Sequence, residues 1–342
     1  MSNIYILAII TALISIIITP LVKKFAIKVN AIDIPKDERR VHNKPIPIMG
    51  GLAIYIAFVI GTILYSGILT RSQLGIIIGA TIIVMGGLID DIKDLSPKYK
   101  LLIQVLAAIC LLISGVRISI ITNPFRGFYP YLNIGWIHIP VTIIWIVGVT
   151  NAFNLIDGLD GLAAGIAFIS SVTLMIVAII NGRLEAAFLT AVLSGAILGF
   201  LPYNFNPASI FMGDTGSQLL GFLLAAISIE GAIKSATAFV IAVPILAFGL
   251  PIYDTLFAMI RRKVNGKSIM QADKGHLHHR LLDMGLSQKQ AVIIMYFVSA
   301  VLGGIAIIAM QLSTQRAYFL LALVMVIIVS IAWKYGIFEH KD

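Results

Sequence analysis

Long apolar runs dominate the chain, and most of them approach the length of a membrane-spanning helix. A helix needs about 20 mainly apolar residues to cross the hydrocarbon core of a bilayer. Short polar segments separate eleven such runs. The expected spans are residues 4–22, 49–69, 74–89, 101–116, 139–153, 162–180, 186–201, 217–229, 235–253, 291–312 and 317–333. The pattern predicts an all-α, polytopic integral membrane protein that forms a single domain over residues 1–342.

The composition favours the same class of protein. Hydrophobic residues make up 59% of the chain and charged residues 12%, whereas soluble domains have about 45–50% and about 25%. A soluble enzyme, a disordered chain and a nucleic-acid-binding domain do not fit these values. The single cysteine, Cys110, leaves no intrachain disulfide and no Cys-based metal site. The first apolar run lacks a basic leader and a cleavage pattern, so we interpret it as a membrane helix.

Lysine and arginine residues set the expected orientation. With the N-terminus outside and the C-terminus in the cytoplasm, 19 of the 25 Lys and Arg lie in inner segments. This is the distribution that the positive-inside rule describes. It explains the net charge of +9 without a nucleic-acid partner. The expected cytoplasmic loops are residues 23–48, 90–100, 154–161, 202–216 and 254–290.

Acidic residues gather on the same face. Fourteen of the 16 Asp and Glu lie in inner segments, and only Glu185 and Glu230 lie outside. Acidic residues contribute little to topology, so the clustering indicates a cytoplasmic active site. A transporter, the main non-enzyme alternative, carries its ionisable groups near the bilayer midplane. Here the spans are nearly free of charge, and Asp254 stands at the inner end of the ninth span.

Three carboxylates end the third span. Asp90, Asp91 and Asp94 lie within one helical turn of each other, so their like charges require a cation or a basic partner. Lys100, at the start of the next span, is the candidate partner. The alternative is a solvated acidic helix end, which the helix dipole disfavours at a C-terminus.

Amides and carboxylates also follow the fifth span. Asn151, Asn154 and Asp157 recur every three residues, and Asp160 follows after Gly158. Amide and carboxylate oxygens suit Mg²⁺, and a carboxylate also accepts a hydrogen bond from a nucleobase N–H. The alternative is a polar turn between two helices.

Two further segments offer alternatives that the residues alone leave open. In 211–217, small residues around Asp214 allow a phosphate or a metal to approach the backbone, or else Asp214 or Thr215 caps a helix. In 37–45, cationic residues bind either anionic lipid headgroups or a substrate phosphate. The outer segment 117–138 is rich in Gly and Pro and predicts a loop or a short hairpin.

Three histidines cluster in the last long inner segment. His276, His278 and His279 lie between Lys274 and Arg280, which suits contact with a sugar phosphate. A zinc site and a solvated loop are the alternatives. After this cluster, Ser287 and Gln290 have the spacing of a capping box and predict the start of the next helix.

In this order, these elements resemble the polyprenyl-phosphate N-acetylhexosamine-1-phosphate transferase family over essentially the whole chain. The resemblance rests on Met49-Gly50-Gly51, Asp90-Asp91, 151–162, 212–217 and 276–280. It implies transfer of a sugar 1-phosphate from a UDP-sugar to a lipid phosphate, with release of UMP and a requirement for Mg²⁺, for which Mn²⁺ is the alternative. It also implies a multi-pass protein of the plasma (inner) membrane with a cytoplasmic active site.

The resemblance also implies roles for the phosphate-binding residues. Asp214 resembles the principal Mg²⁺ ligand, and Asn154 resembles a second ligand. Lys44 and Lys100 fall where family members contact phosphates. Asp90 and Asp91 match the paired carboxylates, as base, nucleophile or organiser of the metal and cations.

Other motif positions are expected to act on the reacting groups or on the donor. Asp157 is assigned with the catalytic carboxylates, and Asp160 resembles the residue that reads uracil. The remaining donor-binding candidates are Asn151, His276, His278, His279 and Arg280.

The His-Leu-His-His-Arg run resembles the branch that uses UDP-N-acetylglucosamine. The phospho-MurNAc-pentapeptide transferase of peptidoglycan synthesis is the alternative. The length of the chain and the lack of a large extra insertion favour undecaprenyl phosphate as the acceptor. Glycine-rich faces at Gly75, Gly79 and Gly86 permit close helix contact, either within one protomer or in a homodimer.

Overall fold

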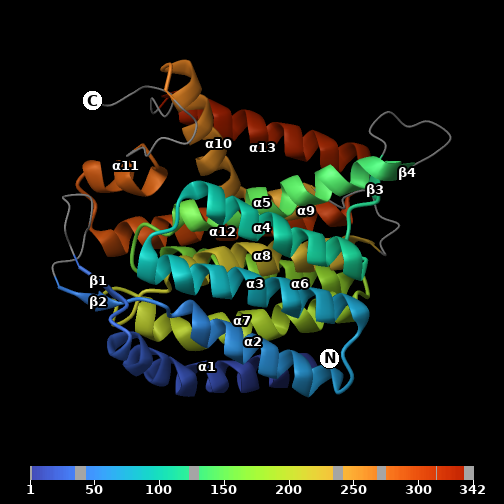
Figure 1. The fold of residues 1–342 in the computed structure, drawn as a ribbon. Helices are drawn as coiled ribbons and strands as arrows, with labels where there is room; N and C mark the ends of the chain where they lie inside the picture. Colours follow the sequence, from blue (N-terminus) through green and yellow to red (C-terminus); the bar gives the residue numbers. More distant parts are fainter. Residues whose placement is uncertain are drawn as a thin grey trace.

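The protein is mainly helical, as the apolar pattern predicts (Figure 1). The computed structural model describes residues 2–34, 44–122, 131–233, 242–267, 275–312 and 314–334. The helices are α1 (Ser2–Lys28), α2 (Gly51–Ser66), α3 (Arg71–Lys93), α4 (Pro97–Ser114), α5 (His138–Ile156), α6 (Leu162–Ile180), α7 (Leu184–Asn204), α8 (Gly213–Ile233), α9 (Ala242–Ala247), α10 (Gly249–Val264), α11 (Leu277–Asp283), α12 (Gln288–Gln311) and α13 (Thr314–Lys334).

Two small antiparallel hairpins depart from the purely α prediction. Strand β1 (Ile32–Asp33) pairs with β2 (Ile46–Pro47). Strand β3 (Ile120–Thr122) pairs with β4 (Tyr131–Asn133), and the 3-10 turn η1 (Gly135–Ile137) leads into α5. The second hairpin lies within residues 117–138, where a loop or short hairpin is expected.

Seven helices are long and apolar enough to cross a membrane, counting only described residues. They are α1, α3, α4, α5 together with η1, α6, α7 and α12. Helix α2 and part of α13 are apolar but shorter. The structure therefore confirms a polytopic membrane class, while the count of eleven spans and the orientation of the termini stay predictions.

Local sequence explains several helix boundaries. Thr70 and Gln73 form a capping box at the start of α3, and Ser287 and Gln290 form the predicted one at the start of α12. Pro97 occupies the first turn of α4, where a missing N–H costs no helical hydrogen bond.

The predicted ninth span, 235–253, is not one continuous helix. Residues 234–241 lie outside the described part, and the helix that follows breaks at Phe248. Pro251 stands in the first turn of α10, a position that suits a residue without an N–H. Helix α10 then continues to Val264, and α11 adds a further helix, so the described residues of the predicted loop 254–290 are largely helical.

Helix α8 lies at the centre of the bundle. It packs most extensively on α3 and α5, and it also contacts α2, α6 and α7. Its middle carries side chains with no exposed surface, among them Leu219, Phe222 and Leu224. Because α8 is enclosed on several sides, its first turn is fixed relative to the ends of the surrounding helices.

Glycines allow the first turn of α8 to approach its neighbours closely. A Cβ on Gly51 of α2 would overlap the backbone of Gly216, and a Cβ on Gly87 of α3 would overlap that of Thr215. The backbone N–H of Gly51 also donates to the carbonyl of Met212 over 2.9 Å. These contacts explain why Met49-Gly50-Gly51 lies near the carboxylate motifs.

Glycines on the rest of α3 are used within the protomer. A Cβ on Gly75 would overlap the Ser114 side chain of α4, and one on Gly79 would overlap Phe222 of α8. Close packing of α3 therefore involves its own neighbours. A homodimer gains no support from these glycines and stays a prediction.

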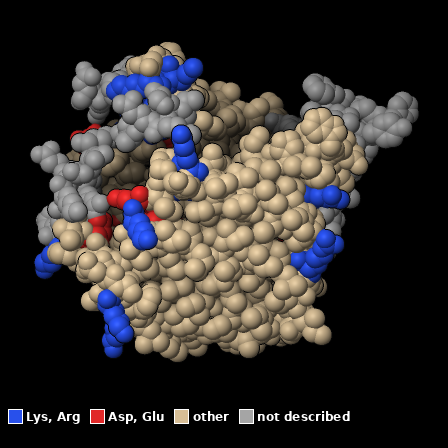
Figure 2. Space-filling view, viewed as in Figure 1, with Lys and Arg blue, Asp and Glu red and all other residues tan. Residues whose placement is uncertain are grey.

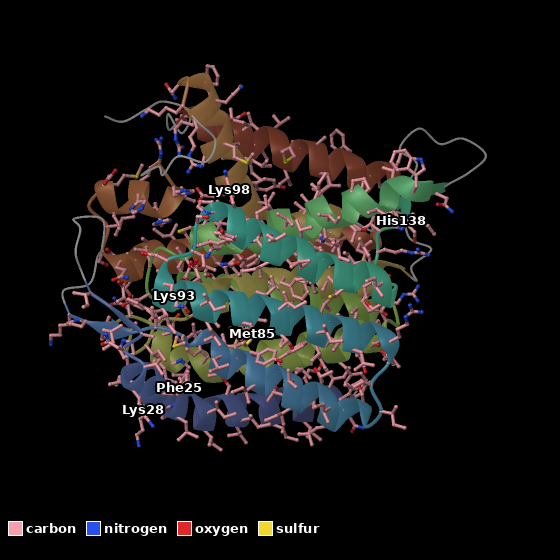
Figure 3. The ribbon with its side chains drawn as sticks, in the orientation of Figure 1. Phe25, Lys28, Met85, Lys93, Lys98 and His138 are labelled. Carbon is pink, nitrogen blue, oxygen red and sulfur yellow. The ribbon has the colours of Figure 1, made fainter. Side chains whose placement is uncertain are left out.

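The two ends of the bundle differ in character. Lys28, Lys93 and Lys98 lie at one end, and His138 lies at the opposite end (Figure 3). At the lysine end, Asp and Glu side chains gather in a hollow of the surface (Figure 2). The functional residues predicted from the sequence can therefore come together at the lysine end of the bundle.

Candidate active site

A cavity of about 900 Å³ opens at the lysine end of the bundle. Its walls come from β1, the end of α3, the start of α4, the α5–α6 turn, the start of α8, and α11. The predicted residues that line it are Asp90, Asp91, Lys100, Asn154, Asp157, Asp160, Asp214 and His279. Segments that are far apart in the sequence thus meet at one site.

Lys100 joins two carboxylates at the centre of this cavity. Its Nζ lies 2.6 Å from Asp90 Oδ2 and 2.6 Å from Asp214 Oδ2. Asp90 is 5% exposed, and its Oδ1 accepts a 2.7 Å hydrogen bond from the Leu95 N–H. The prediction that Lys100 is a partner of the α3 carboxylates is confirmed for Asp90.

Asn154 completes the contacts of Asp214. Its Nδ2 donates to Asp214 Oδ1 over 3.0 Å and to Ser217 Oγ over 2.9 Å. Nitrogen and oxygen of an amide are assigned from such contacts, and a hydroxyl partner accepts or donates equally well. Rotation of the amide by 180° would turn its oxygen toward Asp214. The Ser217 hydroxyl, which donates to the Gly213 carbonyl over 3.1 Å, would then have to donate to the amide oxygen instead.

Asp91 caps the N-terminus of α8 from a different helix. Asp91 Oδ1 accepts from the Asp214 N–H over 2.7 Å, and Oδ2 accepts from the Thr215 hydroxyl over 2.6 Å. The first N–H groups of a helix have no partner within the helix, so a carboxylate there satisfies them. Gly213 enters the helix at φ +70 and has no Cβ that would strike this carboxylate. Asp91 therefore holds Asp214 in place.

Asp157 ends α5 beside several negative charges. Burial, together with the charges of Asp214, Asp91 and Asp160, raises the pKa of Asp157 to about 8. Negative charge is thus in excess around this carboxyl, and a cationic ligand would relieve it.

In solution without divalent cations, Asp157→Asn will raise thermal stability by an amount that grows as pH rises from about 4 to about 8. The folded state holds a proton on Asp157 in this range that the unfolded state has lost, so ionisation destabilises the fold. Melting curves of both proteins in chelator across this range measure the difference. A difference that does not change with pH would contradict the assignment.

Asp160 lines the cavity and also holds the segment after α7. Its Oδ2 accepts from the Ala208 N–H over 2.9 Å and from Asn206 Nδ2 over 3.1 Å. Asn206 donates in turn to Gln288 Oε1 over 2.7 Å. One carboxylate oxygen of Asp160 thus stabilises the fold, and the residue is also part of the cavity wall.

The four residues at 276–280 that are predicted to bind the donor differ in whether they face the cavity. His279 lines the cavity. His276, His278 and Arg280 are 5%, 2% and 6% exposed and face the protein interior. Burial lowers the pKa of His278 to about 3, which keeps its ring neutral. Lys274 lies outside the described residues.

Asn151 and Lys44 do not line the cavity. Asn151 Nδ2 donates to Gln104 Oε1 over 2.7 Å, and Gln104 Nε2 contacts Gln218 Oε1 over 3.1 Å, so these amides join α4, α5 and α8. Lys44 is exposed just before β2. The rest of the cationic segment before it, residues 37–43, lies outside the described part. Substrate roles for Asn151 and Lys44 stay predictions.

The oxygens around Asp214 fit a hard divalent cation. Asp90 Oδ2 is buried without a hydrogen bond and lies 2.6 Å from Lys100 Nζ. Asp214 and a rotated Asn154 present two more oxygens, and Mg²⁺ is commonly held by one or two carboxylates, water and substrate phosphates. No three His, Cys, Asp or Glu side chains in the described ranges could by themselves hold a metal. Water and a phosphate-bearing ligand would complete such a site.

Comparisons with known proteins agree with this geometry. Residues 73–232 match the model of glycosyl transferase family 4. A probable undecaprenyl-phosphate N-acetylglucosaminyl 1-phosphate transferase of Bacillus subtilis (strain 168) is 42% identical over 342 residues, which are 100% of this chain and 94% of that protein. The chain belongs to glycosyl transferase family 4. The resemblance drawn from the motifs is confirmed.

Two other relatives of this glycosyl transferase family 4 member carry related names. A decaprenyl-phosphate N-acetylglucosaminephosphotransferase of Mycolicibacterium smegmatis is 36% identical over 83% of this chain and 77% of that protein. A phospho-N-acetylmuramoyl-pentapeptide-transferase of Halalkalibacterium halodurans is 30% identical over 76% of this chain and 82% of that protein. All three names describe transfer of a sugar phosphate.

Some site residues of this family member have no clear sequence signal. Asp33 of β1 and Gln288 of α12 line the cavity, yet each stands outside the carboxylate and histidine motifs. Asp254 is a lone acid at the end of an apolar run, and only its position at the inner face distinguishes it. Its contacts are with the start of α11, so they depend on how α10 and α11 pack and cannot be read from the sequence.

Proposed function

We propose that this protein transfers N-acetylglucosamine 1-phosphate from UDP-N-acetylglucosamine to undecaprenyl phosphate and releases UMP. The observation that supports this proposal most strongly is that four side chains meet in one cavity at the lysine end of the bundle. They are Asp90, Lys100, Asn154 and Asp214. The 42% identical relative, named for undecaprenyl phosphate and for N-acetylglucosaminyl 1-phosphate transfer, supports the choice. The relative named for the muramoyl-pentapeptide donor is 30% identical, which favours N-acetylglucosamine.

The charges of the cavity support a single displacement. A phosphate oxygen of the lipid attacks the phosphorus that bears the sugar, the P–O bond to UMP breaks, and a lipid–sugar diphosphate forms. A lipid phosphate monoester is mostly dianionic at neutral pH and needs little help from a base. Lys100 offers its ammonium group to phosphate oxygens, because positioning and electrostatics dominate phosphoryl transfer. Asp214 and Asn154 would hold Mg²⁺, which would supply further positive charge to the diphosphate.

The carboxylates of α3 support this scheme over a phospho-enzyme. Both oxygens of Asp91 accept hydrogen bonds from the start of α8, and Asp90 is engaged by Lys100 and the Leu95 N–H. A nucleophilic carboxylate needs an oxygen that points at the substrate. We therefore assign Asp90 and Asp91 to organising charge and position.

The location of the cavity supports a cytoplasmic reaction. Most Lys and Arg lie in the segments that the positive-inside rule assigns to the cytoplasm, and Lys28, Lys93 and Lys98 mark the cavity end (Figure 3). A transporter is not favoured, because the acids gather at one end of the bundle (Figure 2).

Exchange of radiolabelled UMP into UDP-N-acetylglucosamine tests the function and the scheme together. We expect exchange by the purified protein only when undecaprenyl phosphate and Mg²⁺ are both present. No exchange under these conditions would contradict the proposed function. Exchange without the lipid would contradict the single displacement, because it requires a sugar-phosphate intermediate on the protein. UDP-MurNAc-pentapeptide is the matched donor control, and efficient use of it would favour the other branch.

Asp160→Asn will raise the KM for UDP-N-acetylglucosamine by about 5–150-fold with a smaller change in kcat. The variant keeps an oxygen for the Ala208 N–H, but its amide presents N–H where uracil needs an acceptor. Loss of one such hydrogen bond costs about 1–3 kcal/mol. Initial rates at varied donor concentration measure the change, and an unaltered donor KM would count against the uracil role.

A further inference from the structure

Asp254, which lies on α10, binds His276 and Leu277 at the start of α11. Its Oδ2 lies 2.7 Å from His276 Nδ1, and its Oδ1 accepts a 2.9 Å hydrogen bond from the Leu277 N–H. Asp254 is 9% exposed and His276 is 5% exposed, so water competes little for these contacts. One carboxylate thus fixes both the ring of His276 and the first turn of α11.

Ring contacts continue from this anchor to the cavity. The rings of His276 and His278 are nearly parallel, with centroids 5.9 Å apart, and those of His278 and His279 are 4.2 Å apart. His278 also packs against Gly158, where a Cβ would overlap its Nε2. His279 then lines the cavity. The contacts form a continuous path from Asp254 to the side chain that faces the substrate space.

Helix α11 needs such an anchor. It has seven residues, and helices this short are unstable in water without tertiary contacts. Its first turn has no side-chain cap of its own, and the Asp254 carboxylate takes that place. Without this carboxylate, the Leu277 N–H and the His276 ring would lose their partner inside the protein.

We propose that Asp254 is a positioning residue for donor binding, which acts through His276 and the start of α11 to hold His279 in the cavity. The assignment rests on the proposed function, because it takes the occupant of the cavity beside His279 to be the UDP-sugar. Asp254 is not among the residues that line the cavity, so we assign it no direct contact with the reacting groups. Its effect is therefore on the geometry of the donor site.

A kinetic double-mutant cycle tests the proposal. We expect Asp254→Ala to raise the KM for UDP-N-acetylglucosamine about tenfold, which is in the range for the loss of one hydrogen bond to the donor, and to leave the KM for undecaprenyl phosphate unchanged. Combined with His279→Ala, it should add little to the effect of His279→Ala alone, because residues that act through one contact are not additive. Fully additive effects on donor KM, or equal effects on both KM values, would overturn the proposal.

Two further measurements test the same proposal independently of the double-mutant cycle. Asp254→Asn retains an acceptor for the Leu277 N–H and can donate its amide N–H to a neutral ring nitrogen of His276, so it should raise the donor KM less than Asp254→Ala. Equal increases in the donor KM of both variants would overturn the proposal. Hydrogen exchange of the 275–283 segment, measured without substrate, should accelerate in Asp254→Ala and not in the control Asp283→Ala, which alters an exposed acid of α11. Equal protection in all three proteins would overturn the proposal. A failure of the proposed function appears instead as an inactive unaltered protein.

Discussion

Asp214→Asn will reduce transfer by about a thousandfold or more. Asparagine has the shape of aspartate and can still contact Asn154 and Lys100, but it removes the charge at the centre of the cavity. In phosphoryl transfer, a metal and its ligands contribute several kcal/mol of charge stabilisation, and about 4 kcal/mol corresponds to a factor of about a thousand. UMP release at saturating substrates, measured over a range of Mg²⁺ concentrations, gives the size of the loss.

The matched control for Asp214→Asn is Asp283→Asn, which removes an exposed acid at the end of α11. It should keep its activity. Melting temperatures in chelator will show whether the Asp214 variant is folded. Activity near that of the unaltered protein in a well-folded Asp214→Asn variant would remove Asp214 from the proposed metal site.

Asp91→Ala will reduce kcat by about a hundredfold, whereas Asp91→Asn will retain much more activity. Alanine leaves the N–H of Asp214 and the hydroxyl of Thr215 without their acceptor, so the first turn of α8 shifts. A displacement of about 1 Å in a reacting arrangement costs about a hundredfold in rate. Asparagine keeps one acceptor for the Asp214 N–H, and its amide can donate to the Thr215 hydroxyl. Turnover numbers of both variants measure the contrast.

The same pair of variants distinguishes positioning from covalent or base catalysis. Asparagine can act neither as a nucleophilic carboxylate nor as a base, so a chemical role for Asp91 requires that both substitutions abolish transfer equally. Equal and complete loss in two folded variants would therefore refute the capping role. Thr215→Val, which removes one donor to the same carboxylate, should have a smaller effect than Asp91→Ala.

Sequence patterns were informative where a physical property repeats along the chain. Apolar runs predict the helices, since burial in a bilayer demands long apolar segments. The motif at 151–162 predicts a polar helix end, and the structure places Asn154, Asp157 and Asp160 at the cavity. The need of clustered acids for a basic partner predicts Lys100, which lies between Asp90 and Asp214.

Contacts between distant segments could not be read from the sequence. Asp90 and Asp91 are adjacent, yet successive side chains of a helix point in different directions, so one meets Lys100 and the other caps α8. Asn151 and Asn154 are three residues apart, but a neighbouring glutamine, Gln104, engages only Asn151. Hydropathy likewise does not reveal the break at Phe248, because both halves of that segment are apolar.

The ammonium group of Lys100 is covalently tethered at the point where Asp90 and Asp214 approach each other. A dissolved counter-ion would diffuse away with the departing product, but a side chain remains. The two carboxylates thus keep an opposite charge beside them from one catalytic cycle to the next. The cavity can empty and refill without mutual repulsion pushing α3 away from α8.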